Sequence, residues 1–330
     1  MQAMSYTRFG PAADVLKKVT LHTPTPQSGE VLVELAVSGV NPSDVKARSG
    51  SRPGITKPAF AQIVPHSDGA GIVVAVGDGV PRERIGSRVW IWNGQWQRAL
   101  GTASTHICLP SEQAVTLPDN ISFNTGANLG IPGLTACHAV FGGDAIDGQT
   151  LLIQGGAGTV GLLAVQLAKW GGAHVIATAS NNRMRAAQTA GADVVLDYQA
   201  EDLSEQIIDA NGGKLINRII EVEFGLNVKV DSEVVEPNGT IAAYGSAQSM
   251  TPKLNFGPLL FKAVTIDVLL IYLLPKLQRN IAIERLHDAL NQGAIKCPTA
   301  AIYSLDRCVE AHEAVEAAGR DGAILLDLQT

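Results

Sequence analysis

Three glycines near the middle of the chain have the spacing of a phosphate-binding turn. Gly156, Gly158 and Gly161 form the pattern G-x-G-x-x-G directly after an apolar segment. In this pattern the first glycine permits a tight turn, the second lets the backbone approach a pyrophosphate, and the third allows close packing of a helix on a strand. The following helix offers unpaired N–H groups to the anion. The predicted cofactor loop therefore comprises Gly156, Ala157, Gly158, Thr159, Val160 and Gly161.

The surroundings of this loop decide between a cofactor site and an ordinary glycine-rich turn. Apolar strands are predicted before it and after it, at Leu151–Gln154 and His174–Thr178. The residues between them place one apolar face along a helix, at Val160, Leu163, Ala164, Leu167 and Ala168. A strand, a glycine loop, a helix and a second strand are the setting of a dinucleotide site, which we prefer to the simple turn.

The end of the second strand indicates which nucleotide is bound. NAD sites usually have an Asp or Glu there to bind the ribose 2′-hydroxyl, but Ala179–Arg183 contains no acid, and Arg185 follows closely. A carboxylate would repel a 2′-phosphate, whereas a hydroxyl and an arginine can bind it. We therefore predict NADPH, with Ser180, Arg183 and Arg185 as candidates. The alternative is that both arginines are solvated residues on a helix surface.

The elements around the loop predict a two-part α/β fold. The first third reads as strands separated by turns, at Val31–Val37, Gly71–Val76 and Arg88–Trp92. From about residue 151 strands alternate with helices, as in a parallel sheet with crossover helices, and the further strands are Val194–Asp197, Arg218–Val222 and Thr240–Tyr244. Near the C-terminus we expect helices at Ile281–Leu290 and Asp306–Ala318 and a strand at Ala323–Leu328.

Composition favours a small-molecule partner. The 330 residues are 46% hydrophobic with a net charge of -6, which argues against general attraction to nucleic acid or an anionic membrane surface. The start MQAMSYTRFG lacks a signal-peptide pattern, and the longest apolar run, Val264–Leu274, is short and contains Asp267. The four cysteines form no C-x-x-C pair, so neither a disulfide framework nor a cysteine-rich zinc lobe is indicated. We expect a cytoplasmic protein.

Several separated motifs give the chain a resemblance to a known family. These are SGVNPSDVKARSG, PHSDGAGIVVAVGDGV, GIPGLTA, GGAGTVG, NGTIAAYGS and EAHEAVEAAGRDGAILL, in this order along the chain. Over nearly its whole length the sequence resembles the zinc-independent quinone oxidoreductases related to zeta-crystallin, within the medium-chain dehydrogenase/reductase superfamily. The resemblance implies a GroES-like β-rich catalytic domain at 1–124, completed by 268–330, and a Rossmann doubly wound parallel-sheet domain at 125–267.

The resemblance also implies site residues and an assembly. The matching positions are Asn41 and Asp44 near the nicotinamide end, Thr135 beside the cofactor, Tyr198 near the adenosine phosphate, and Gly245 and Ser246 after the fifth strand. Lys46 departs from the pattern, because many relatives have tyrosine there. Met184, between the two arginines, stands where a bacterial relative would have a phosphate-binding lysine. A homodimer or homotetramer through sheet edges is implied, with VTIDVLLIYLL as the candidate edge or, alternatively, an internal strand.

No metal site is expected. Zinc-dependent relatives would have ligands where this chain has Asn41, Ser67 and Ile131. His66 is only a neighbour of the ligand position, and a histidine without cysteine partners is more often structural. Without zinc, oxidation of an alcohol is hard, because the metal normally lowers the pKa of the hydroxyl. Direct hydride transfer to an electron-poor quinone or enone is easier, since the protein need only position two rings and exclude water.

Roles for the remaining candidates follow from this chemistry. Asn41 would hydrogen-bond the cofactor or acceptor, Asp44 would hold its loop, and Lys46 would be a cation near the developing enolate. The alternatives are that Asn-Pro-Ser-Asp is simply a turn and that Lys46 is solvated. Trp92 and Trp96 would wall a flat apolar acceptor pocket, or else pack beneath a long loop.

Three functions remain open at this point. The first is NADPH-dependent reduction of an apolar quinone, and the second is reduction of the double bond of an enone or 2-alkenal. The third, of another class, is an NADPH-binding protein with little turnover that acts structurally or binds RNA, as some zeta-crystallin relatives do. The acidic balance and the absence of a basic stretch argue against RNA.

Overall fold

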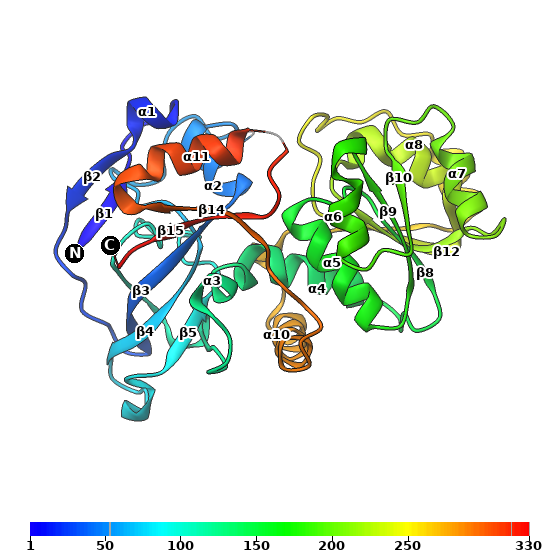
Figure 1. Ribbon diagram of the computed structural model, residues 1–330. Helices are drawn as coiled ribbons and strands as arrows, with labels where there is room; N and C mark the ends of the chain where they lie inside the picture. Colours follow the sequence, from blue (N-terminus) through cyan, green and yellow to red (C-terminus); the bar gives the residue numbers. More distant parts are fainter. Residues whose placement is uncertain (53, 318, 330) are drawn as a thin grey trace. The chain divides into compact units, whose positions relative to one another are not determined.

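Both ends of the chain contribute to the first of two folding units (Figure 1). In this computed structural model, which describes residues 1–52, 54–317 and 319–329, the first unit consists of Met1–Ile131 and Cys297–Thr330. The second unit is Pro132–Lys296. These limits differ from the expected ones at 124 and 267. The segment 268–296 belongs to the second unit because helix α10 (Lys276–Asn291) packs on α4 (Leu134–Phe141), where the Arg285 guanidinium donates to the Phe141 carbonyl at 3.0 Å.

A six-stranded parallel sheet organises the second unit. Its spatial order is β10-β9-β8-β11-β12-β13, which is 3-2-1-4-5-6 in order of appearance and confirms the doubly wound Rossmann arrangement. The strands are β8 (Thr150–Ile153), β9 (His174–Ala179), β10 (Val194–Asp197), β11 (Ile216–Glu221), β12 (Val235–Ala243) and β13 (Thr265–Val268). The helices after β8 are α5 (Thr159–Trp170), α6 (Met184–Thr189), α7 (Leu203–Ala210), α8 (Phe224–Val234) and α9 (Phe256–Phe261).

The neighbouring strands β8 and β9 of this sheet are largely apolar. Leu151, Leu152 and Ile153 of β8 are fully buried, as are Val175 and Ile176 of β9. Continuous apolar runs of this kind arise because helices cover both faces of a parallel sheet. The strand β13 lies at one edge; its last residue, Val268, is 78% exposed, and Leu273 beyond it is 63% exposed. The segment VTIDVLLIYLL is therefore an edge strand followed by a short turn of helix.

The long strand β3 (Glu30–Val40) is the centre of the first unit. Its antiparallel partners are β4 (Asp68–Val76), β6 (His106–Pro110) and, from the other end of the chain, β15 (Ala323–Asp327). The sheet is completed by β5 (Arg88–Ile91), β7 (Ala114–Thr116) and β14 (Thr299–Ser304), while β1 (Gln2–Ser5) and β2 (Lys17–Thr20) pair separately. This β-rich unit agrees with the expected GroES-like domain.

In the described part of the first unit, two helices of a single turn and two of about two turns accompany these strands. They are α1 (Ala12–Val15), α2 (Pro42–Ser49), α3 (Phe123–Gly126) and α11 (Cys308–Glu316). The helix expected at 306–318 corresponds to α11 and the turn before it, and its expected last residue, Ala318, lies outside the described residues. The buried face of α11 packs on β15, α1 and α2.

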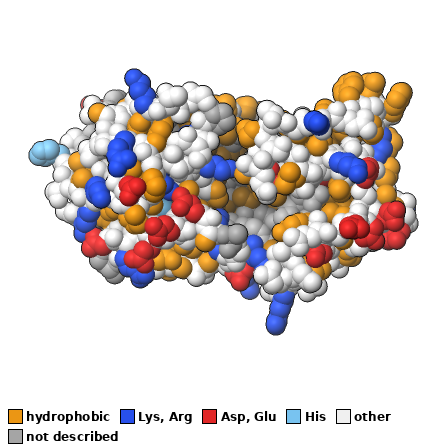
Figure 2. Space-filling model, turned by 90° about the horizontal axis from the view of Figure 1, so that it is seen from above, with side chains coloured by type: hydrophobic (Ala, Val, Ile, Leu, Met, Phe, Trp, Pro, Cys, Tyr) orange, Lys and Arg blue, Asp and Glu red, His pale blue; other side chains and the backbone are white. Residues whose placement is uncertain are grey.

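The surface carries mixed charge. On the face in Figure 2, lysine and arginine side chains are interspersed with aspartate and glutamate over both units. No helix in the described part of the chain is both long enough and apolar enough to cross a lipid bilayer.

Candidate functional site

The glycine loop joins β8 to α5 in a tight turn. Gly155 has a φ of 67°, and the Gly156 N–H donates to the Thr178 carbonyl at 2.8 Å. Gly158 is the N-cap of α5 and has no side chain that could accept from the first N–H groups of the helix. Because these donors lie at the positive end of the helix dipole, the loop and helix together can bind an anion.

The three glycines are needed for different reasons. A Cβ at Gly161 would lie 2.2 Å from the Gly155 carbonyl oxygen, and one at Gly156 would lie 2.8 Å from the Ala177 Cβ. A Cβ at Gly158 would meet only the Gly155 oxygen, at 3.3 Å, and the Gly158 φ of -76° suits any residue. Packing therefore demands glycine at 156 and 161 but not at 158. At 158 an added Cβ would make a tight contact but no overlap, and the absence of a side chain suits a ligand that approaches the backbone closely.

Buried polar groups hold the start of the loop. The Thr178 hydroxyl accepts from the Gly155 N–H at 3.1 Å and donates to the Gln154 side chain at 2.7 Å. The Gln154 amide in turn donates to Asp231 at 3.0 Å. Burial raises the pKa of Asp231 well above its usual range, and the nearby Glu221 adds to this effect. These hydrogen bonds hold the first residues of the glycine loop at the carboxyl ends of β8 and β9.

The structure brings one of the two candidate arginines to the loop. The Arg183 guanidinium donates to the Ala157 carbonyl, inside the glycine loop, whereas Arg185 is exposed on α6. The Ser180 hydroxyl donates to the Asn182 side chain at 2.9 Å. Tyr198, after β10, is 49% exposed, and its N–H donates to the Ala179 carbonyl at 3.3 Å. Three of the predicted residues therefore gather at the carboxyl ends of β9 and β10.

The remaining candidates of the second unit have structural roles of their own. The Ser246 hydroxyl accepts from the Gly225 N–H at 2.9 Å and so closes the loop after β12. A Cβ at Gly245 would lie 2.3 Å from the Val222 carbonyl oxygen, so packing requires this glycine. Thr135 is buried in α4 and lines a hollow of about 230 Å³ with His138 and residues 267–271 and 273–275.

In the first unit, Asn41 and Asp44 belong to a buried polar cluster. The Asp44 carboxylate accepts from the Asn41 N–H at 2.8 Å at the start of α2. The Asn41 amide donates to Asp68 at 2.8 Å, and the two Asp68 oxygens accept from the Ile131 N–H at 2.9 and 3.0 Å. Asp68 is fully buried. Sequence reasoning missed it, and the available signal was an acid in the apolar motif HSDGAG.

Burial makes both acids of this cluster weak. It raises the pKa of Asp44 to about 7, against the lowering effects of the hydrogen bond from Asn41 and of Arg52. Burial also raises the pKa of Asp68 well above its usual range, and the Asp44 charge raises it further. Two buried carboxyl groups in one cluster therefore favour a state that retains a proton near neutral pH.

We expect Asp44→Asn to remove a pH dependence of stability. The folded-state pKa of about 7 exceeds the usual value of 3.8, so folding takes up a proton between these values. The stabilisation is complete below pH 3.8 and is lost as the pH rises through 7, at up to about 1.4 kcal/mol per pH unit. Urea unfolding at pH 5, 6, 7 and 8 should give a difference between parent and variant that changes in this direction. A difference that is constant with pH would contradict it.

Of the remaining candidates in the first unit, Lys46 is exposed to solvent, whereas the two tryptophans are at least partly buried. Lys46 is exposed on α2, and within residues 1–52, 54–317 and 319–329 its ammonium makes no hydrogen bond or ion pair. Trp92 is 7% exposed, and its indole N–H donates to the Glu112 carbonyl at 3.2 Å. Trp96 is half-buried. The Trp92 indole is thus held against the segment that contains Glu112.

The positions of the family zinc ligands do not offer a zinc donor set. Ser67 is buried, Ile131 has an apolar side chain, and the Asn41 amide is already bonded to Asp68. The expectation that His66 stands alone is wrong, however. His66 lies with Cys308 and His312 in one buried cluster, with ligand atoms within 4.8 Å of one another.

Comparison with known proteins gives the same family from the sequence and from the fold. Residues 27–119 match the alcohol dehydrogenase GroES-like domain, and residues 159–287 match the family described as zinc-binding dehydrogenase. The quinone oxidoreductase of Rattus norvegicus is 30% identical over 99% of this chain and 97% of its own length.

Two solved structures have the same fold over nearly the whole chain. The quinone oxidoreductase of Pseudomonas syringae has a TM-score of 0.87 and 28% identity, with 99% of each chain covered. That of Escherichia coli, complexed with NADPH, has a TM-score of 0.85 and 26% identity, with 99% of this chain and 100% of that chain covered. The chain belongs to the quinone oxidoreductase family of the medium-chain dehydrogenase/reductase superfamily.

Proposed function

We propose that this protein is an NADPH-dependent quinone oxidoreductase that works without zinc. The observation that carries the proposal is the glycine loop at the start of α5, where the backbone conformation of Gly158 does not require glycine and packing restricts a side chain there less than at Gly156 or Gly161. A pyrophosphate held by the loop and the helix N-terminus explains that glycine. The names of the relatives supply the acceptor class, since they are quinone oxidoreductases.

The phosphorylated nucleotide is supported by the end of β9. No acid stands there to repel a 2′-phosphate, and Ser180 and Arg183 lie beside the loop. The NADPH complex of the Escherichia coli neighbour agrees with this choice. Bound NADPH would supply the hydride, and the residues of this chain would orient it and exclude water. Asparagine, serine and isoleucine at the zinc-ligand positions support transfer without a metal, because none of these side chains is a usual zinc ligand.

Roles for the other candidates remain proposals. Asn41 would hydrogen-bond the cofactor or acceptor, Asp44 would hold its loop, and Lys46 would stabilise negative charge on the acceptor. Thr135, Tyr198, Gly245 and Ser246 would contact the cofactor, and Trp92 and Trp96 would limit the acceptor space. Lys46→Ala tests the most distinctive of these roles: turnover with a quinone should fall more than NADPH affinity. Unchanged steady-state kinetics would remove Lys46 from the site.

We expect Arg183→Ala to weaken NADPH binding roughly 10- to 100-fold, since a hydrogen bond to a charged group contributes about 1.5 to 3 kcal/mol. NADH affinity should change little, because NADH has no 2′-phosphate. Calorimetric titration of both nucleotides measures this, and Arg185→Ala is the matched control because that side chain is exposed on α6. Equal affinity of the parent protein for both nucleotides, or equal losses in the Arg183 variant, would contradict the assignment.

A panel of acceptors tests the function itself. NADPH oxidation should be fastest with benzoquinones and naphthoquinones and slower with enones and 2-alkenals. Preference for the conjugated double bond would favour the reductase alternative. Tight NADPH binding without turnover of any acceptor would favour a structural or RNA-binding protein instead.

An assembly through the β13 edge is also proposed. Apolar side chains around it are exposed, with Phe261, Val268 and Leu277 at 89%, 78% and 69%. A homodimer or homotetramer would cover them, and sedimentation equilibrium of the parent and of Val268→Lys would measure the change in mass. A parent that sediments as a monomer would overturn this proposal. A cytoplasmic location is proposed with it, on the grounds of the free thiols.

A further inference from the structure

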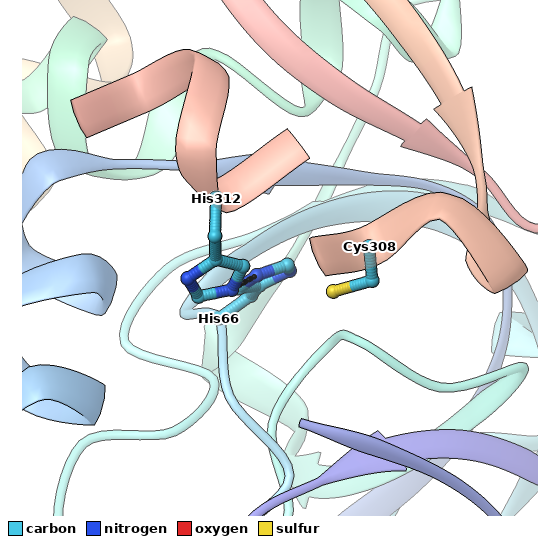
Figure 3. Close-up of side chains that lie close together, drawn as sticks. All are labelled: His66, Cys308 and His312. Atoms are coloured by element: carbon cyan, nitrogen blue, oxygen red, sulfur yellow. Dashed lines mark hydrogen bonds between the residues drawn. The ribbon is translucent and has the colours of Figure 1, made fainter. Parts of the chain in front are cut away.

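Two histidines and a cysteine meet in the core of the first unit. Cys308 and His312 are four residues apart on the buried face of α11, and His66 lies in the loop before β4. All three side chains are fully buried. Figure 3 shows the Cys308 sulfur directed toward the two imidazole rings. Imidazole and thiolate are the side-chain donors that transition metals prefer, and here they converge on one point.

A chain of hydroxyl groups fixes the protonation of His66. The Thr102 hydroxyl donates to the Asp68 carbonyl at 2.6 Å, which uses its only proton. Thr102 then accepts from the Ser38 hydroxyl at 2.9 Å, so Ser38 accepts from the His66 Nδ1–H at 3.0 Å. His66 Nε2 therefore carries no proton, and its lone pair lies on the side of the ring away from the Ser38 hydroxyl. Histidine metal ligands are usually held in this way, with the second nitrogen donating to a neighbouring acceptor.

His312, the second histidine, has a ring nitrogen without a hydrogen-bond partner among the described residues. His312 Nε2 lies 2.9 Å from His66 Nε2, so in the metal-free protein it must carry the proton shared by this pair. His312 Nδ1 is buried and has no hydrogen-bond partner among the described residues. His312 Nδ1 lacks a partner in either tautomer of the ring, so moving the ring proton onto it breaks no hydrogen bond there. Burial also lowers the pKa of His312 to about 3, so the ring stays neutral.

Small movements would convert the cluster into a metal site. Two nitrogens bound to one ion at about 2.0 Å each lie roughly 3.3 to 3.5 Å apart, so the imidazoles need to separate by only about half an ångström. The His312 proton can move from Nε2 to the vacant Nδ1 of the same ring. The Cys308 thiol then loses its proton to solvent when the sulfur binds the ion.

Charge and ligand number select the class of ion. The site has three ligands, and within the described residues no fourth Cys, His, Asp or Glu joins them. A thiolate and a monovalent ion are together neutral, which suits a fully buried site, whereas a divalent ion would leave one uncompensated positive charge. Thiolate and imidazole ligands suit soft Cu(I), while zinc prefers a fourth ligand.

We propose that His66, Cys308 and His312 form a binding site for one Cu(I) ion per chain. The site does not depend on NADPH or on the reaction proposed above. Because the ligands are buried, loading requires α11 to separate briefly from the sheet and is therefore slow.

Anaerobic titration with Cu(I) against bathocuproine disulfonate tests the proposal. The matched control is the triple variant Cys108→Ser, Cys137→Ser, Cys297→Ser, in which Cys308 is the remaining cysteine. Parent and triple variant should each bind one Cu(I). Adding Cys308→Ser should lower the affinity roughly 100-fold or more, and Ser38→Ala, which removes the acceptor for His66, should lower it roughly 10- to 100-fold.

A second measurement covers the case in which the Cys308 variant folds poorly. Cu(I) should raise the thermal midpoint of the triple variant, and His312→Gln should abolish the rise, with far-UV circular dichroism as the check on folding. One equivalent of Cu(I) that is lost with Cys308 and with His312 supports the site. No binding by the triple variant, binding retained without Cys308, or preferential binding of Zn²⁺ from a buffered Zn²⁺ solution would each overturn it.

Discussion

Gly158→Ala should weaken NADPH binding roughly 10- to 100-fold while changing the free energy of unfolding by no more than about 1 kcal/mol. The added Cβ meets only the Gly155 oxygen, at 3.3 Å, and the φ of -76° is normal for alanine, so the folded protein can accept it. A pyrophosphate against the start of α5 would instead meet the new methyl group and lose hydrogen bonds from the helix N-terminus. Calorimetric titration with NADPH and urea unfolding measure the two effects.

This interpretation requires that the affinity for NADPH falls while the free energy of unfolding stays close to that of the parent. A variant that loses stability as well as affinity would show that Gly158 is needed for packing. A variant that binds NADPH as tightly as the parent would place the pyrophosphate elsewhere, and the proposed cofactor loop would then be wrong. Gly257→Ala in α9 is a suitable control, because the nearest atom to its added Cβ is 3.7 Å away. That change should alter neither quantity appreciably.

Gly161→Ala should have the opposite profile and destabilise the protein itself, by roughly 3 kcal/mol. Its added Cβ would lie 2.2 Å from the Gly155 carbonyl oxygen and 2.9 Å from the Gly156 Cα. Both atoms belong to the backbone, so no side chain can rotate away and the loop must separate from α5. NADPH affinity should fall as a consequence.

The two glycine variants are best measured together. Urea unfolding of the cofactor-free protein should rank Gly161→Ala far below the parent and Gly158→Ala close to it. A Gly161 variant as stable as the parent would contradict the close packing of the loop on the helix. Since the two positions are three residues apart in one turn, the contrast separates packing from ligand binding within a single loop.

The strands of the parallel sheet could be predicted from the sequence where burial on both faces gives them a continuous run of apolar residues. The strand expected at Leu151–Gln154 is β8 at Thr150–Ile153, and β10 has its expected limits. The strand β12 was expected at Thr240 but begins at Val235, because Glu-Pro-Asn-Gly has the composition of a turn. The residues do bend locally: Asn238 has a φ of 63°. The ladder to β11 also shifts register between Ile216 and Arg218.

The candidate site also has a part that the sequence could predict and a part that it could not. The glycine loop is contiguous, so its spacing alone could indicate a phosphate site. The Asn41 and Asp68 side chains are 27 residues apart, and His66 and His312 are 246 apart. No local pattern connects such residues, because their contact depends on how β4 and α11 pack in the folded unit. The four-residue spacing of Cys308 and His312 was the one local signal of that cluster.

The place of the last strand has a consequence for how the protein is made. The strand β15 pairs with β3 and β14, and its Ile324, Leu325 and Leu326 are buried, with exposed fractions of 3%, 0% and 0%. These residues leave the ribosome after Pro132–Lys296, which emerges earlier as a complete segment. Domains generally fold as units while the chain is synthesised. The nascent chain therefore completes the second unit first, and the edge of β3 stays unpaired until β15 has been synthesised.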